Sequence, residues 1–165
     1  MRSHTTLSRA YTGSMAGLDK DNSFSILRAG NGDADLARQA VAEVHGRTPV
    51  DPDSISEFLH NPAHYLILAL NGGQVVGSLM GYRLQHPHRS DPQFLLYEID
   101  VRTEHRSRGI GRALVAGFIR EAKDAGAFEV WVLTSRSNKT AMKLYTHCGL
   151  RPQQDDDVML SLMLK

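Results

Sequence analysis

The sequence predicts a single α/β domain built on a mixed sheet, and two observations carry this prediction. In the first half, two apolar runs flank the turn sequence at residues 71–73, which indicates an antiparallel hairpin. In the second half, strand and helix patterns alternate, which indicates a parallel strand pair with a right-handed crossover. The chain has 165 residues, 41% of them hydrophobic and 22% charged, which suffices for one core.

Each element of the N-terminal half has a local signal. Alternation predicts the first strand, and apolar spacing of three and four predicts a helix that Asp33 or Asp35 caps. Prolines end that helix, and Asp53 or Ser54 is the expected cap of a second, shorter one. In chain order we expect a strand over 24–28, helices over 33–45 and 53–59, and strands over 63–70 and 75–84.

The C-terminal half begins after a polar, proline-bearing loop over residues 86–92. Its long helix has an apolar face with Ile110, Leu114, Phe118 and Ala122 at spacings of four. In chain order we expect a strand over 94–101, a helix over 109–125, a strand over 128–134, a helix over 138–147 and a last strand over 158–164.

The ends of the chain, its charge and its cysteine content narrow the class of protein. Residues 1–22 lack periodicity, so we expect an arm or leader outside a domain that spans 23–165. The net charge of +1 argues against a nucleic-acid-binding protein, and no apolar run reaches the length of a membrane span. Cys148 is the single cysteine and no apolar signal segment is visible, so we expect a cytoplasmic location.

The most informative stretch is the junction between the strand over 94–101 and the helix that follows it. Gly109 and Gly111 stand where that helix begins, so a ligand can approach the backbone closely. The N–H groups of a helix start have no partner, and they attract anions together with the helix dipole. Arg106, Arg108 and Arg112 add positive charge. This combination predicts a cradle for a pyrophosphate group.

Two other phosphate-binding motifs do not fit this junction. A Walker A loop needs a Gly-Lys-Ser/Thr sequence, which is missing. A dinucleotide-binding fingerprint needs a third glycine where Leu114 stands, and too few residues follow for further βαβ units. The remaining alternative is an ordinary glycine-softened helix start with solvated arginines. A second motif, over residues 138–150, argues against it.

Two motifs together resemble the GCN5-related N-acetyltransferase superfamily. The first is Arg-x-x-Gly-x-Gly over residues 106–111, and the second runs from Asn138 to Leu150. The likeness extends from about Phe24 to the C-terminus. A narrower likeness to the aminoglycoside 3-N-acetyltransferase branch rests on the segments 51–54, 97–101, 104–106, 144–146 and 158–159. The segment 151–157 is longer than that branch leads us to expect.

The resemblance implies a fold with antiparallel N-terminal strands and a splayed parallel pair, 94–101 and 128–134. Acetyl-coenzyme A would be the co-substrate, with its pantetheine arm between the splayed strands and its pyrophosphate at the helix start. The residues that the resemblance assigns to this ligand are Ile99, Asp100, Val101, Arg106, Ser107, Arg108, Gly109, Ile110, Gly111, Arg112, Ala113, Thr134, Asn138 and Ala141.

Two residues are the catalytic candidates. Asn138, Ala141 and Tyr145 share one helix face through spacings of three and four. The resemblance implies that Tyr145 hydrogen-bonds the sulfur of coenzyme A as it leaves; the alternative is a buried core tyrosine. Glu98 precedes Ile99 and faces away from the apolar layer, so its carboxylate can take the proton of an attacking amine. The alternative for Glu98 is a solvated carboxylate on a sheet face.

The expected acceptor is a polycationic amine. In the resembled superfamily the first helices and the loop before the last strand line the acceptor site, so acidic residues there would attract ammonium groups. These candidates are Asp51, Asp53, Glu57, Asp100, Asp155, Asp156 and Asp157. The branch likeness implies the 3-amino group of an aminoglycoside, hence a resistance enzyme. The bland alternative for residues 155–157 is a solvated turn.

Rival functions remain open at this point. One is acetylation of a protein N-terminus, a lysine or a polyamine. Another is a non-catalytic acyl-coenzyme A-binding module, which would lack Tyr145. No Cys and His set has zinc-site spacing, so no metal is expected. The oligomeric state is not specified by the sequence, and a homodimer stays open.

Overall fold

The structure of the protein, a computed structural model, describes residues 9–11, 23–153, 159 and 161–164. In chain order its elements are β1 (Arg9–Tyr11), β2 (Ser25–Arg28), α1 (Ala34–Gln39), the π-helical turn η2 (Ala40–Val44), α2 (Pro52–His60), β3 (His64–Asn71), β4 (Gln74–Leu84), β5 (Gln93–Val101), the 3-10 turn η3 (Thr103–His105), α3 (Ile110–Asp124), β6 (Glu129–Val132) and α4 (Lys139–His147).

Six strands form one mixed sheet in the order β1-β2-β3-β4-β5-β6. Strands β1 to β5 are antiparallel neighbours, whereas β5 and β6 are parallel. The hairpin β3–β4 closes where Asn71 pairs with Gln74, and the two glycines between them have positive φ. Such a two-residue turn matches the twist of its strands. The mixed α/β prediction is therefore confirmed.

Part of the N-terminal segment belongs to this sheet. Arg9–Tyr11 forms β1 and pairs antiparallel with β2, with Ala10 opposite Leu27. The other described strands have the positions that periodicity predicted to within a few residues. The sheet thus gains an edge strand from a stretch in which the sequence pattern showed no strand.

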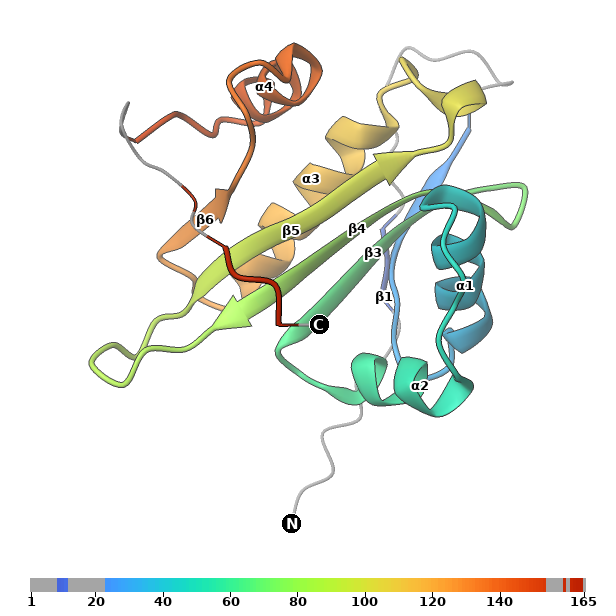
Figure 1. The fold of residues 1–165 in the computed structure, drawn as a ribbon, viewed down its shortest axis with the longest axis horizontal. Helices are drawn as coiled ribbons and strands as arrows, with labels where there is room; N and C mark the ends of the chain where they lie inside the picture. The colour runs from blue at the N-terminus through green and yellow to red at the C-terminus, as the bar shows by residue number, and fades with distance from the viewer. Residues whose placement is uncertain (1–8, 12–22, 154–158, 160, 165) are drawn as a thin grey trace.

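Helices cover both faces of the sheet (Figure 1). Helix α3 lies on one face, and α1, η2 and α2 lie on the other. On the α3 face Phe94, Leu114 and Phe118 are fully buried. Gly81 is essential there, because a Cβ at this position would come within 2.5 Å of the Phe118 ring and 2.7 Å of the Leu95 carbonyl oxygen. The absence of a side chain lets α3 pack closely on β4.

The first two helices differ from their predicted bounds. The α-helical pattern of α1 ends at Gln39, and the chain continues as the π-helical turn η2. The N-cap of α2 is Asp51 rather than Asp53 or Ser54, and it accepts a hydrogen bond from the Ser54 N–H at 2.9 Å, so the helix begins at Pro52. The first position of a helix tolerates proline, because a backbone N–H there would have no helical acceptor in any case. Pro52 can therefore be the first residue of α2.

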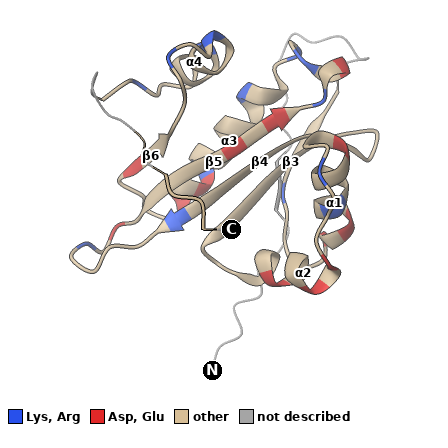
Figure 2. Cartoon of the chain, viewed as in Figure 1, with Lys and Arg blue, Asp and Glu red and all other residues tan. Residues whose placement is uncertain are grey.

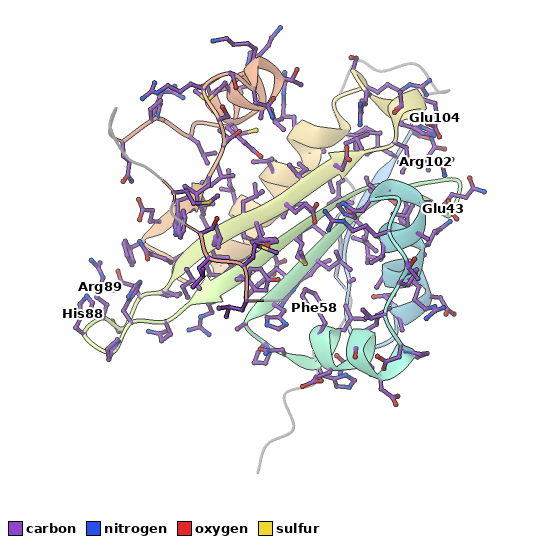
Figure 3. The ribbon with its side chains drawn as sticks, viewed as in Figure 1. Glu43, Phe58, His88, Arg89, Arg102 and Glu104 are labelled. Carbon is purple, nitrogen blue, oxygen red and sulfur yellow. The ribbon has the colours of Figure 1, made fainter. Side chains whose placement is uncertain are left out.

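The connection from β5 to α3 is tied to the opposite layer by Arg102. Its Nη1 donates to Glu43 of η2 at 2.9 Å, and its Nε donates to Glu104 of η3 at 2.7 Å (Figure 3). One arginine therefore links the segment after α1 to the loop that leads into α3. The residues that follow η2 and the loop that leads into α3 are thus held by the same side chain.

The predicted last strand is wrong for the residues that the structure describes. Met159 and residues 161–164 carry no strand, and Met159, Leu162, Met163 and Leu164 are 73–85% exposed. An alternating apolar pattern gives a strand only where an unpaired sheet edge accepts its backbone, and these residues have no ladder partner. None of the described helices has both the length and the apolar character needed to cross a bilayer.

Candidate active site

The start of α3 offers backbone donors to a ligand. Its N-cap, Gly109, has φ of +82° and no side chain to bond the first turn. The first helical hydrogen bond runs from the Ala113 N–H to the Gly109 carbonyl at 3.0 Å. Helical geometry leaves the N–H groups of Ile110, Gly111 and Arg112 without helical partners. The glycine conformation thus leaves the positive end of the helix dipole uncapped by a side chain, and anion binding at this helix start stays a prediction.

The loop before α3 is held against the end of β5. Arg106 donates from Nε to the Val101 carbonyl at 2.9 Å and from Nη2 to Asp100 Oδ1 at 3.1 Å. Asp100 Oδ1 also accepts from the Val101 N–H at 2.7 Å. Three groups that the sequence assigned to ligand binding are therefore engaged with one another. Ser107 follows with φ of +62°, and Arg108 is exposed.

Strands β5 and β6 diverge beside this loop. Their parallel pairing covers only residues 93–96 of β5 and 129–132 of β6. On its β6 side, the backbone of Ile99, Asp100 and Val101 has no strand partner among the described residues. The splayed pair expected from the family resemblance is present. Thr134 lies exposed just beyond the end of β6.

Helix α4 carries the other candidates of the ligand set. Asn138 is its N-cap, and its side-chain oxygen accepts from the Ala141 N–H at 3.1 Å, so its acceptor group serves the helix. Tyr145 is 8% exposed and packs in the core cluster of the α3 face. Burial raises the pKa of the Tyr145 hydroxyl above its ordinary value. The phenol therefore stays protonated and remains a hydrogen-bond donor.

The other face of the sheet holds a cavity of about 240 Å³. Its walls come from α1, η2, α2, β3, β4 and β5, and most of them are apolar. Ala40, Val41, Ile55, Phe58, Leu66 and Met80 are among the apolar residues. The polar groups at its surface are His45, Arg47, Ser54 and Glu98.

Glu98 brings a carboxylate to this cavity. It lies opposite Met80 in the β4–β5 ladder, and Asp100 lies opposite Ser78 on the same face. A register shift in the ladder leaves Tyr97, the residue before Glu98, without a partner on β4. The centroid of the Tyr97 ring lies 5.6 Å from that of Tyr82. The Glu98 side chain is 24% exposed, so its carboxylate is partly accessible.

Arg47 and His45 surround the Glu98 carboxylate. Arg47 donates from Nη1 to Oε2 at 3.0 Å and from Nη2 to Oε1 at 2.7 Å. The Nδ1 atom of His45 lies 3.6 Å from the same Oε1. The other ring nitrogen, Nε2, is 2.7 Å from the hydroxyl of Ser78, which is fully buried on β4. Sequence reasoning missed His45, Arg47 and Ser78.

The acidic candidates of α2 lie outside this cavity. Ser54, Ile55 and Phe58 line it, whereas Asp53 and Glu57 are exposed and do not. Asp51 binds Ser54 with both carboxylate oxygens, at 2.9 and 2.7 Å, and these hydrogen bonds lower the Asp51 pKa. Figure 2 shows the acidic residues of α2 and the basic residues of α4 and of the start of α3. Residues 155–157 lie outside the described residues.

Within the described residues, no three His, Cys, Asp or Glu side chains gather closely enough to hold a metal ion. Cys148 is a free, half-buried thiol beside the α3 core, and burial raises its pKa.

Comparison with known proteins gives a family match. Residues 34–150 match the model of the acetyltransferase (GNAT) family. N-acetyltransferase family 8 member 2 of Rattus norvegicus is 32% identical over 84 residues, which are 51% of this chain and 37% of that protein. N-acetyltransferase 8 of Rattus norvegicus is 28% identical over 99 residues, which are 60% of this chain and 45% of that protein. The matched region thus spans less than half the length of these curated relatives.

Solved structures share the fold over most of the chain. An aminoglycoside acetyltransferase from an uncultured soil metagenomic sample, in complex with sisomicin, superposes with a TM-score of 0.77 at 23% identity, covering 89% of this chain and 100% of that one. The aminoglycoside N-acetyltransferase AAC(6')-Iy, in complex with a bisubstrate analogue, superposes with a TM-score of 0.70 at 19% identity, covering 86% of this chain and 99% of that one. A ribosomal-protein-alanine N-acetyltransferase from Brucella melitensis biovar Abortus 2308 superposes with a TM-score of 0.65 at 21% identity, covering 84% of this chain and 100% of that one.

Proposed function

Since this chain belongs to the acetyltransferase (GNAT) family, we propose that it moves an acetyl group from acetyl-coenzyme A to a primary amine. The favoured acceptor is the 3-amino group of an aminoglycoside, which would make the protein a resistance enzyme. We place this activity in the cytoplasm, where the single cysteine, Cys148, stays reduced.

One structural relationship carries the proposal. Strand β5 serves two sites: beyond its end lie the unpaired donors at the start of α3, and Glu98 on the same strand faces the cavity. An anionic ligand at the helix start and an amine in the cavity would therefore meet along β5. Direct transfer in a ternary complex needs this arrangement, because reacting groups must be held close together.

The residues have separable roles in this proposal. When bound, acetyl-coenzyme A supplies a thioester that is activated toward amines. The N–H groups of Ile110, Gly111 and Arg112 would hold its pyrophosphate. The pantetheine arm would lie along residues 99–101 of β5, where it would have to replace the side-chain partners of the Val101 backbone, Asp100 and Arg106. Glu98 would accept the proton that the amine loses as it attacks the carbonyl carbon.

Tyr145 would donate a hydrogen bond to the departing sulfur. Reference pKa values of about 10 for tyrosine and about 8.5 for a thiol already make full proton transfer uphill by about 2 kcal/mol. Burial raises the Tyr145 pKa and makes that transfer less favourable still. The role that fits this tyrosine is a hydrogen bond to the developing negative charge rather than acid catalysis by complete proton donation.

Two observations support an aminoglycoside as acceptor: the sequence likeness to the 3-N branch, and the fold shared with acetyltransferases that hold sisomicin or a neamine-based bisubstrate analogue. A specific observation favours a second candidate. The cavity walls are mostly apolar, and among the described residues that line it Glu98 is the only carboxylate. Such a cavity suits an amine with an apolar substituent, for example the N-terminal residue of a peptide.

A substrate panel tests the proposal. The protein is incubated with acetyl-coenzyme A and either aminoglycosides, polyamines, lysine or peptides with apolar N-terminal residues, while thiol release is followed. We expect turnover with aminoglycosides and, by NMR of the product, an acetyl group on the 3-amino nitrogen. Turnover with peptides alone would replace the aminoglycoside by the second candidate. Absence of thiol release with every amine would overturn the transferase proposal.

A further inference from the structure

The segment after α1 delivers an imidazole to the cavity through an irregular turn. The five residues of η2 form a π-helical turn, and the His45 N–H bonds the Ala40 carbonyl at 3.2 Å, five residues back. A π-helical turn holds more residues than an α-helical one, so it rotates whatever follows it. Such turns recur at functional sites. Here the turn brings His45 over β4, beside Ser78 and Glu98.

The two ring nitrogens of His45 face different partners. Nε2 is 2.7 Å from the Ser78 hydroxyl, and Nδ1 is 3.6 Å from Glu98 Oε1. A neutral imidazole has one donor and one acceptor nitrogen. If Ser78 donates to Nε2, the proton of the ring lies on Nδ1 and faces the carboxylate, so both contacts are favourable. Ser78 is fully buried, so it cannot act as a nucleophile toward a thioester.

Arg47 and His45 hold Glu98 in different ways. The Arg47 side chain is 63% exposed, whereas that of His45 is 10% exposed. An ammonium group that binds Glu98 competes with the guanidinium, because Arg47 donates to both carboxylate oxygens. Once Arg47 leaves, His45 is the contact that the fold itself keeps in place.

We propose that His45 is a positioning residue, which keeps the Glu98 carboxylate aimed at the acceptor amine, and that Ser78 fixes its tautomer. This inference rests on the proposed acetyl transfer. In that reaction the C–N bond forms, the C–S bond breaks with its electron pair left on the sulfur as a thiolate, and the proton of the amine passes to Glu98. His45 keeps its own proton on Nδ1 throughout, so the step needs no further acid or base.

Kinetics of three variants test the proposal with an acceptor identified in the panel. Loss of the imidazole in His45→Gln should lower kcat about tenfold and leave the KM for acetyl-coenzyme A unchanged. Ser78→Ala should lower kcat about threefold, and the double variant should be no worse than His45→Gln alone, because both changes act through one imidazole. His60→Gln is the matched control: this exposed histidine also contacts a serine, Ser56, but lies outside the cavity.

Nitrogen NMR of the histidine rings tests the contact without turnover. We expect the Nδ1–H tautomer for His45 in the parent and its loss in Ser78→Ala. If the parent acetylates no amine, the proposed function fails, and the tautomer still decides whether Ser78 and Glu98 orient this ring. A folded His45→Gln protein with kcat within twofold of the parent, or an Nε2–H tautomer in the parent, overturns the inference. If His45→Gln does not fold, the kcat and tautomer of Ser78→Ala decide in its place.

Discussion

Arg47 donates two hydrogen bonds to the Glu98 carboxylate, although the two residues are 51 positions apart in the chain. The guanidinium comes from an exposed side chain, whereas the carboxylate stands at the wall of the cavity. Exposed ion pairs typically contribute about 0.2–1 kcal/mol, but this pair is bidentate and its carboxylate is 24% exposed, so it is stronger than a typical surface pair. In the proposed reaction, a substrate ammonium that binds Glu98 would compete with Arg47 for this carboxylate.

Arg47→Gln should lower the acceptor KM by up to about fivefold, because the amine no longer competes with a guanidinium for Glu98. Steady-state kinetics at low and high salt checks this, and the gain should shrink as salt screens the parent's ion pair. Arg89→Gln is the control, since it breaks another arginine–carboxylate pair, with Asp91 in the loop after β4. A higher acceptor KM in Arg47→Gln would show instead that Arg47 binds the acceptor.

Gly109→Ala should reduce the rise in Tm that acetyl-coenzyme A produces by mass action. Gly109 has φ of +82°, where a Cβ costs about 1–2 kcal/mol, and relief of that strain turns the first N–H groups of α3 away. Gly126→Ala at the other end of α3 carries the same backbone penalty, with φ of +70° and no atom close to the new Cβ. Acetyl-coenzyme A should raise the Tm of Gly126→Ala by as much as it raises that of the parent. Equal ligand shifts in the two variants would remove the start of α3 from the binding site.

Tyr145→Phe should lower kcat about tenfold or more while the KM for acetyl-coenzyme A changes little, because the lost hydrogen bond matters as charge develops on sulfur. Since burial raises the Tyr145 pKa, ionisation of this hydroxyl should cause no loss of kcat below about pH 10. Tyr65→Phe removes a hydroxyl from another buried tyrosine of the same core and should leave kcat unchanged. A change of less than twofold in Tyr145→Phe, equivalent to about 0.4 kcal/mol of barrier, would make Tyr145 a packing residue.

Glu98→Gln should depress kcat, because an amide cannot accept the proton of the amine. The defect should be smallest at high pH, where more of the acceptor arrives already deprotonated. A pH profile of kcat for parent and variant measures this. Asp91→Asn also removes a carboxylate from an exposed arginine pair, and its profile should follow the parent's. A defect of the same size at every pH would contradict the role of Glu98 as the base.

Replacing Asp155, Asp156 and Asp157 by asparagine should raise the acceptor KM for an aminoglycoside, with kcat little changed, because uniform binding is lost. The effect should shrink at high salt. Asp53→Asn combined with Glu57→Gln should have a smaller effect, since these residues lie outside the cavity. Equal acceptor KM values for parent and triple variant at both salts would separate the acidic run from the acceptor and weaken the aminoglycoside proposal.

Local patterns in the sequence predicted the features that depend on neighbours along the chain. The glycines at 109 and 111, the hairpin turn at Gly72 and Gly73, and the spacing from Asn138 to Tyr145 are such features. Each follows from backbone conformation or from periodicity within a few residues, so the order of the elements and the uncapped start of α3 could be predicted. The pattern of the last predicted strand failed for the described residues, because a strand also needs an edge to pair with.

Only the tertiary structure decided how Glu98 is surrounded. Ser78 and His45 are 33 residues apart, and Arg47 and Glu98 are 51 apart. Their meeting depends on where η2 packs on β4 and β5, and no local pattern of residues carries that information. The structure likewise showed that Asp100, Arg106 and Asn138 have partners within the protein, whereas the sequence offered them only as polar groups near a ligand. Sequence alone thus specified the glycine-containing start of α3, and packing between distant segments created the cavity with its carboxylate, guanidinium and imidazole.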